Sequence, residues 1–141
     1  MFKKLLFICA LFTAVESAFA DTTVTVEING VTVQGGRVYV AVYSNENDYK
    51  AENSFIRFIL DPVNTTITRN LELPNGEYVV KVFQDSNSNG VLDTNIFGIP
   101  REPVGITNYN LRGMPGGFHK LKVPVNNNAT KILVSIGNPR G

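Results

Sequence analysis

The sequence reads Thr23-Val24-Thr25-Val26-Glu27-Ile28 over residues 23–28 and Val38-Tyr39-Val40-Ala41-Val42-Tyr43 over residues 38–43. In both stretches a β-branched apolar residue stands at every second position, which is the period of a β-strand with one face in a core. Valine, isoleucine, threonine and tyrosine also favour strands. The two stretches therefore predict β-strands and favour an all-β fold class.

Five further stretches are rich in β-branched and aromatic residues and are separated by turn signals that contain Gly, Pro and Asn. These predicted strands cover residues 55–60, 66–73, 77–84, 118–125 and 131–136. Only residues 46–53 could hold a short helical turn. About seven short strands in one chain favour a single antiparallel β-sandwich of immunoglobulin-like architecture, with a closed barrel as the alternative.

The first 20 residues have the pattern of a secretory signal peptide. Lys3 and Lys4 form a basic start, residues 5–15 an apolar centre, and Ala18-Phe19-Ala20 a cleavage site. The apolar centre is shorter than the roughly 20 residues that cross a bilayer. We therefore expect cleavage after Ala20, one domain over residues 21–141 without a membrane span, and a periplasmic or secreted product.

Charge and composition exclude several kinds of site. Of the 13 basic residues, Lys3 and Lys4 lie in the predicted signal, and of the 12 acidic residues Glu16 does, so the rest of the chain has no net charge. A neutral domain is a poor partner for nucleic acid or for an anionic membrane surface. The one cysteine also lies in the signal, and the one histidine, His119, falls in the predicted strand 118–125. Zinc sites built from histidine and cysteine, and cysteine nucleophiles, are therefore excluded.

The longest connection, residues 85–117, begins with Asp85-Ser86-Asn87-Ser88-Asn89-Gly90-Val91-Leu92-Asp93 directly after a predicted strand. It contains no convincing strand, and connections of this length are usually functional. Oxygen ligands at every second position, followed by a glycine that permits a sharp turn, are typical of the first half of a calcium loop. The predicted Ca²⁺ ligands are Asp85, Asn87, Asn89, the carbonyl of Val91, and Asp93, with Leu92 anchoring the loop in the core.

The second half of this calcium pattern is incomplete. Its twelfth position, which normally holds a bidentate glutamate, is Ile96. We expect Glu102, or the side chain of Asn95, to supply the missing ligand. With so few carboxylates the predicted site is weak, with a dissociation constant on the order of 10⁻⁴ to 10⁻³ M. The alternative is that no ion binds and that the Asp and Asn side chains close Asx turns within the loop.

Residues 71–83 carry a second motif, Leu-Glu-Leu-Pro-Asn-Gly-Glu-Tyr-Val-Val-Lys-Val-Phe, in which Pro and Gly make a turn and Tyr78 starts a strand. Similar corners occur in many secreted immunoglobulin-like and transthyretin-like modules. Together with the Asp85 loop and Gly98-Ile99-Pro100-Arg101-Glu102, the motif resembles the DUF2141 family of exported bacterial proteins. The chain departs from the family pattern at Gln84, where histidine is common. The resemblance implies an exported β-sandwich of this type and no known activity.

From the sequence we expect an exported, non-enzymatic protein that binds a partner or has a structural role. The partner would be an envelope protein or a glycan, and the rigid sandwich would present the loop of residues 85–102 to it. The alternative is an envelope enzyme, or an accessory of one, that acts on carbohydrate or lipid through carboxylates such as Asp93 and Glu102. Because a sandwich leaves open strand edges, we expect a monomer or a weak oligomer.

Overall fold

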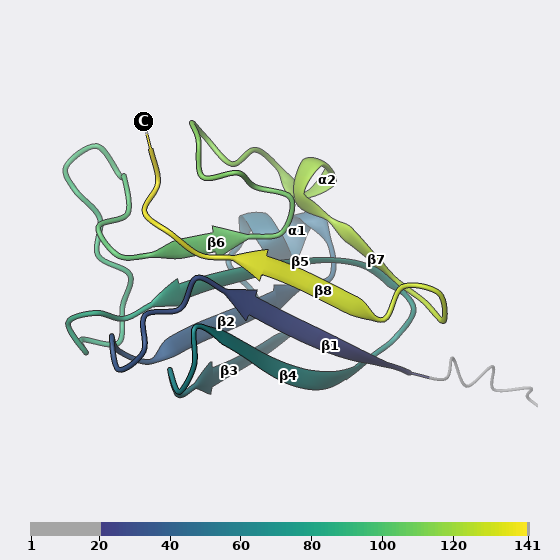
Figure 1. The fold of residues 1–141 in the computed structure, drawn as a ribbon. Coiled ribbons are helices and arrows are strands. Elements are labelled where there is room, and N and C mark those ends of the chain that lie inside the picture. Colours follow the sequence, from purple (N-terminus) through teal and green to yellow (C-terminus); the bar gives the residue numbers. More distant parts are fainter. Residues whose placement is uncertain (1–20, 141) are drawn as a thin grey trace, which may run out of the picture.

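The computed structural model describes residues 21–140, so the predicted signal peptide of residues 1–20 lies outside the described part of the chain. Two β-sheets pack against each other with the apolar core between them (Figure 1). The fold is therefore all-β, as predicted. Among the described residues, no helix combines the length and the apolar character needed to cross a bilayer.

The first sheet has three strands in the order β4-β1-β8. Its central strand, β1 (Thr22–Asn29), pairs antiparallel with β4 (Thr66–Leu73) along its whole length. On its other side, β1 pairs in parallel with β8 (Lys131–Ser135). The expectation of a wholly antiparallel sandwich is therefore wrong at this pair, because the hydrophobic pattern of a strand does not encode the direction of its neighbour.

The second sheet has the order β3-β2-β5-β6, with β7 paired to β5 outside this path. Its strands are β2 (Val38–Tyr43), β3 (Ile56–Leu60), β5 (Gly76–Gln84), β6 (Val104–Ile106) and β7 (Val123–Val125). β6 pairs with residues 81–83 of β5, whereas β7 pairs with residues 76–78 at its start. β5 thus contacts three strands and ends directly before the candidate site.

The predicted alternation decides which side chains enter the core. The inward residues of β1 and β2 are buried and belong to one apolar cluster: Val24, Val26, Ile28, Val38, Val40 and Val42. At the start of β5, the Tyr78 hydroxyl donates a hydrogen bond to the carbonyl of Pro74 at 2.6 Å. The turn that the sequence motif predicted is therefore tied to the strand that follows it.

The segment predicted as one strand over residues 118–125 is wrong in its first half. Residues 118–121 form the helix α2 (Phe118–Leu121), and only β7 is extended. Phe118 and Leu121 are three residues apart, so one helical turn buries both side chains, whereas a strand would point them to opposite faces. His119 is consequently on a helix, where its exposed ring contacts Glu46 at 3.0 Å.

The loop of residues 85–117 was expected to lack strands, yet it contains β6. A strand of three residues is too short to show alternation in the sequence, and it is defined by its pairing with β5. A bridge between Val104 and Gly137 also joins β6 to the segment after β8. The short helical turn predicted within residues 46–53 is confirmed as α1 (Glu46–Lys50), whose N-terminus is capped by Asn45.

A second, smaller apolar cluster lies outside the main core. Its buried members are Tyr43, Val79, Phe118 and Leu121. Phe118 and Leu121 come from α2, and Tyr49 of α1 packs against the same cluster. The two short helices therefore cover part of the second sheet on the side opposite the main core.

Contacts at the end of β5 fix the point where the candidate site begins. The buried Gln84 accepts a hydrogen bond from Thr32 N–H at 2.9 Å, and its amide donates to the carbonyls of Thr32 and Gly36 at 2.7 and 2.9 Å. Asp85 N–H donates to the carbonyl of Arg37 at 2.8 Å. Gly36 has φ of 105°, and a Cβ there would lie 1.8 Å from the Asp85 carbonyl oxygen. Glycine is therefore required where these two segments meet.

Candidate functional site

The candidate site begins with a carboxylate that is turned back onto its own loop. The buried Asp85 side chain accepts hydrogen bonds from the backbone N–H groups of Asn89 at 3.2 Å and Gly90 at 2.8 Å. Gly90 has φ of 78°, which side chains disfavour. The sharp turn predicted at Gly90 is therefore present, and Asp85 stabilises it.

Two asparagine side chains close the next turns. Asn87 Oδ1 accepts a hydrogen bond from Asn89 N–H at 3.3 Å, and Asn89 Oδ1 accepts one from Val91 N–H at 3.1 Å. These are the Asx turns of the alternative interpretation, in which the loop orders itself. Each of these asparagine oxygens keeps a second lone pair beside the hydrogen bond that it accepts.

Asp93 is the point on which the asparagine side chains converge. The amide nitrogen of Asn89 donates to both carboxylate oxygens of Asp93 at 2.9 Å, and the amide nitrogen of Asn87 donates to the same carboxylate. In the described structure, the negative charge of Asp93 is thus balanced by amide dipoles. These three side chains are the part of the predicted ligand set that meets at one place.

Glu102 returns to the loop, as the sequence predicted. Its side chain is buried, and its two oxygens accept hydrogen bonds from Ser86 N–H at 3.0 Å and Asp93 N–H at 3.1 Å. One carboxylate therefore links the start of the loop to its ninth residue. Both partners are backbone N–H donors, so the Glu102 side chain acts here only as an acceptor.

A hairpin within residues 94–100 carries the chain back to Glu102. Thr94 and Pro100 form a bridge, and Asn95 N–H donates to the carbonyl of Ile99 at 2.9 Å. Asn95 Oδ1 accepts hydrogen bonds from the N–H groups of Phe97 and Ile99 at 2.9 and 3.0 Å. Asn95 therefore closes the hairpin, and in the described structure it is not turned toward Asp93.

The tip of this hairpin is apolar and exposed. Ile96 is 91% exposed and Phe97 is 80% exposed. Single exposed apolar residues are ordinary, but Ile96 and Phe97 are adjacent and both are largely exposed, which makes the hairpin tip a candidate interaction surface. Sequence reasoning considered Ile96 only as a missing ligand and did not identify this surface.

One other expectation about the loop has a definite outcome. Leu92 is 38% exposed, so the prediction that it anchors the loop in the core is wrong; the backbone hydrogen bonds to Asp85 and Glu102 do so instead. Within residues 21–140, no three acidic, histidine or cysteine side chains gather closely enough to hold a metal ion by themselves. A cation site here therefore needs the asparagine oxygens as well as Asp93.

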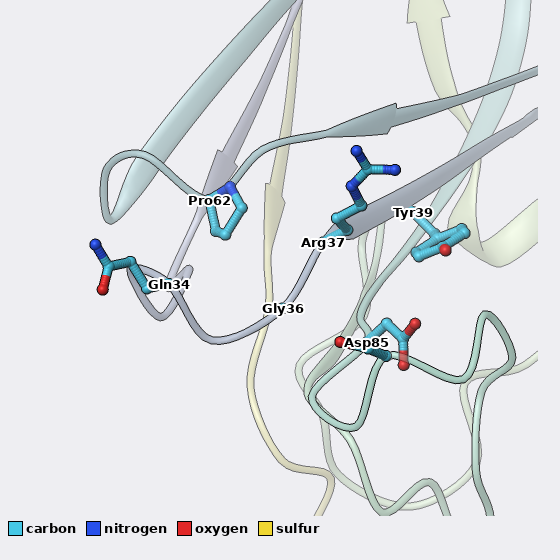
Figure 2. Close-up of a pocket in the computed structure, with 7 residues that line it drawn as sticks. Gln34, Gly36, Arg37, Tyr39, Pro62 and Asp85 are labelled. Atoms are coloured by element: carbon cyan, nitrogen blue, oxygen red, sulfur yellow. The ribbon is translucent and has the colours of Figure 1, made fainter.

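Two hollows of about 450 Å³ flank the start of the loop. The first is lined by Gln34, Gly36, Arg37, Tyr39, Pro62, Asp85 and Ser88 (Figure 2). Figure 2 shows the Asp85 carboxylate pointing away from Gln34 and Pro62. The second is lined by Ser86, Asn87, Asp93, Thr94, Arg101 and Glu102. The second hollow therefore adjoins three of the predicted ligands, Asn87, Asp93 and Glu102, whereas Asp85 lines the first.

A separate polar cluster on the second sheet was not foreseen from the sequence. Glu52 accepts hydrogen bonds from the Tyr43 hydroxyl at 2.9 Å and from Lys81 at 2.8 Å, and Lys81 lies 4.5 Å from the centroid of the Tyr49 ring. Burial, followed by the hydrogen bond to Glu52, raises the pKa of Tyr43 to about 12. Burial alone would raise the pKa of Glu52, but its contacts with Lys81 and Tyr43 lower it.

Comparison with known proteins gives one match. A family model described as "Uncharacterized protein conserved in bacteria (DUF2141)" matches residues 26–133, which run from the second half of β1 into β8. No curated protein and no solved structure matches the chain.

Proposed function

The chain belongs to the DUF2141 family, whose description names no activity, and we therefore propose its function from the site itself. It is an exported, non-enzymatic protein that binds a partner through the loop of residues 85–102. Calcium orders that loop. Its address follows from the signal-peptide pattern of residues 1–20, which predicts a periplasmic or secreted protein. Its mature form is expected to be a monomer or a weak oligomer.

The sandwich is proposed to be immunoglobulin-like. The support is the contact between the Tyr78 hydroxyl and the Pro74 carbonyl at 2.6 Å, at the start of a central strand. Immunoglobulin-like domains use a tyrosine corner of this kind, in which the hydroxyl bonds to the backbone a few residues upstream. Such a scaffold holds its inter-strand loops rigidly at its ends, which suits a protein that acts by presenting a loop.

The convergence of Asn87 and Asn89 on Asp93 carries the calcium proposal. Calcium prefers carboxylate and amide oxygens. An asparagine whose amide nitrogen now faces Asp93 can turn its oxygen to the same point in exchange for the Asx hydrogen bond that this oxygen now accepts. The ion would then replace amide dipoles in balancing the Asp93 charge. The proposed ligands are Asp85, Asn87, Asn89, the Val91 carbonyl, Asp93 and Glu102.

The calcium site is proposed to be weak, and its role structural. Both oxygens of Asp85 and both of Glu102 already accept backbone hydrogen bonds, so each carboxylate has only its remaining lone pairs for an ion. A dissociation constant on the order of 10⁻⁴ to 10⁻³ M suits such an extracellular site. Bound calcium would hold the loop in the conformation that presents Ile96 and Phe97.

Partner binding is assigned to the apolar tip of the loop. Ile96 and Phe97 are exposed, and the hydrogen bonds of Asn95 fix the backbone that carries them. A preorganised apolar anchor loses little entropy when it enters a pocket of another protein. Of the expected partners, an envelope protein with an apolar pocket is therefore favoured over a glycan.

A non-enzymatic role is supported by what the loop carboxylates contact. Asp85 and Glu102 each hold two backbone N–H groups, which suits residues that maintain a conformation. A general acid or base needs a group that can exchange a proton with a substrate. The variant Asp85→Ala separates the two interpretations. If it is less stable to heat and calcium no longer protects it, the loop carboxylates are structural. If it keeps its stability and loses an envelope hydrolase activity, the protein is an enzyme.

Isothermal titration calorimetry with calcium chloride tests the proposed site directly. The wild-type protein is expected to bind one calcium ion, and Asp93→Asn is expected to bind it at least about tenfold more weakly, because the full negative charge at the centre of the site is removed. Asp48→Asn, in the exposed helix α1, is the matched control. Equal heats for wild type and Asp93→Asn would contradict the proposal.

A further inference from the structure

Two arginines that are 28 positions apart in the sequence lie opposite each other in the fold. Arg112, in the loop after β6, and Arg140, in the segment after β8, form a parallel bridge. Arg140 N–H donates to the carbonyl of Leu111 at 2.8 Å, and Gly113 N–H donates to the carbonyl of Arg140 at 3.3 Å. Figure 1 shows this last segment rising beside the loop that precedes α2. Directly paired residues project to the same side of a regular bridge, so we expect the two guanidinium groups to share one face.

This pairing is unfavourable for the isolated protein. Like charges on directly opposite residues destabilise the pairing of the two segments. Both arginines are exposed. None of the ion pairs found within residues 21–140 involves either of them. In the described part of the chain, the two positive charges are thus brought together without a carboxylate to balance them.

The backbone that holds Arg112 is strained and well fixed. Leu111 has φ of 64°, in the left-handed region that branched side chains rarely adopt. Asn110 Oδ1 accepts the N–H of Arg112 at 3.1 Å, and the Tyr109 hydroxyl donates to the carbonyl of Gly113 at 2.7 Å. Strained residues persist only where their surroundings impose them, and they cluster at binding sites.

The segment that carries Arg140 is fixed as well. Gly137 and Val104 exchange two backbone hydrogen bonds, of 2.8 and 2.9 Å, which attach this segment to β6. A Cβ on Gly137 would lie 2.9 Å from Leu111 Cδ1, so the glycine leaves the space that the strained Leu111 occupies. The two arginines are therefore held together by structure on both sides.

We propose that Arg112 and Arg140 form a binding site for a phosphoryl group. Each guanidinium offers paired N–H donors that match the oxygens of a phosphate, and a dianion balances both positive charges. A carboxylate has one charge and two oxygens, so it satisfies only part of the site. The phosphoryl group belongs either to a free phosphate or to the phosphomonoester headgroup of a lipid such as phosphatidic acid, since both present three terminal oxygens and can carry two negative charges. This site is separate from the loop of residues 85–102.

Thermal unfolding in EDTA, with sodium phosphate compared with sodium chloride at equal ionic strength, tests the proposal without any contribution from calcium. Phosphate is expected to raise the melting temperature of the wild type more than chloride does. For Arg112→Gln and Arg140→Gln, the phosphate affinity derived from these shifts is expected to fall roughly three- to tenfold, because each variant loses one charge-assisted contact. Arg69→Gln, on β4, removes the same charge elsewhere and should keep the wild-type response.

Sedimentation with lipid vesicles identifies the source of the phosphoryl group. If vesicles containing phosphatidic acid bind the wild type but neither glutamine variant, and vesicles of phosphatidylglycerol with the same surface charge do not bind the wild type, the ligand is a phosphomonoester headgroup. If phosphate raises the melting temperature in solution but the protein binds no vesicles, the ligand is a free phosphate. Equal phosphate shifts in all four proteins, together with vesicle binding that neither variant changes, would overturn the proposal.

In low salt without phosphate, the glutamine variants should melt no lower than the wild type. A purely structural role for the arginine pair requires that the variants melt at a lower temperature.

Discussion

Glu102 Oε2 accepts a hydrogen bond from the backbone N–H of Asp93 at 3.1 Å. The other oxygen of the same carboxylate binds Ser86 N–H, so one buried side chain closes a loop whose ends are 16 residues apart. This contact explains how a segment rich in Gly, Asn and Ser keeps a defined conformation at the end of β5. It also places a carboxylate beside the residue on which Asn87 and Asn89 converge.

Removing the Glu102 carboxylate is expected to destabilise the protein. In Glu102→Ala, the N–H groups of Ser86 and Asp93 lose a charged acceptor, and the expected cost is about 2 to 3 kcal/mol of unfolding free energy. Glu102→Gln keeps one acceptor oxygen and should lose less. Urea unfolding measures both, with Glu72→Gln on the exposed face of β4 as the control. A change in Glu102→Ala no larger than that of the control would contradict the role of Glu102.

The space beside Gly36 gives a prediction about the anchor of the loop. Gly36→Ala would place a Cβ 1.8 Å from the Asp85 carbonyl oxygen, so a cost above about 3 kcal/mol is expected. Gly98→Ala is the matched control, because Gly98 also has a positive φ but nothing lies within 4 Å of its added Cβ. That variant should lose only about 1 kcal/mol of unfolding free energy, because a side chain disfavours a positive φ. Similar losses of unfolding free energy in the two variants would show that the contact at Gly36 is relaxed in solution.

Phe97 is expected to matter for binding and not for stability. Its side chain is exposed, so Phe97→Ser should change the unfolding free energy by no more than about 0.5 kcal/mol. A photoreactive benzophenone amino acid at position 97 should crosslink one envelope protein in living cells. The same probe at position 72, on β4, should not capture that protein. Identical crosslinking patterns from the two positions would remove the hairpin tip as the binding surface.

Tyr43 predicts how stability changes at alkaline pH. Its pKa is raised to about 12 in the folded protein, first by burial and then by the contact with Glu52, whereas an unfolded tyrosine has a pKa of about 10. The folded state therefore holds the proton more tightly, and its stabilisation is complete below pH ~10 and lost as the pH rises toward 12. Tyr43 itself is buried, but the Glu52 side chain that holds its hydroxyl is exposed to water, so we expect a reduced loss of about 1 to 2 kcal/mol.

Urea unfolding at several pH values checks this prediction. Tyr43→Phe should flatten the decline in unfolding free energy between pH 10 and 12, and Tyr39→Phe, which leaves the contact between Tyr43 and Glu52 intact, should keep it. An equally steep decline in Tyr43→Phe and wild type would assign the alkaline loss to other groups. Burial also raises the pKa values of Tyr49 and Tyr78, so part of the decline should remain in the Tyr43 variant.

Features that depend on local spacing could be predicted from the sequence. Alternation over residues 23–28 and 38–43 indicated β1 and β2 because side-chain direction in a strand has a period of two. The return of Glu102 could be expected because Gly98 and Pro100 favour a turn between it and Asp93. The family resemblance is likewise confirmed by the match over residues 26–133.

Features that depend on which segments meet could not be predicted. The parallel pairing of β1 with β8, and the bridge between Arg112 and Arg140, join residues that are far apart in the sequence. The exposure of the Leu92 side chain could not be predicted, because it depends on where the hairpin of residues 94–100 lies. Phe118 and Leu121 fit a helical turn as well as a strand, and the second sheet they pack against decides between them.

The melting temperature of the wild-type protein in calcium tests the central proposal most directly. At a dissociation constant near 0.5 mM, about 5 mM calcium chloride adds about 1.4 kcal/mol, which raises the melting temperature by about 5 °C for a domain of this size. Sodium chloride at equal ionic strength should have no such effect, and neither should calcium on Asp93→Asn. A wild-type melting temperature that is the same in calcium and in sodium chloride would contradict the calcium-ordered loop.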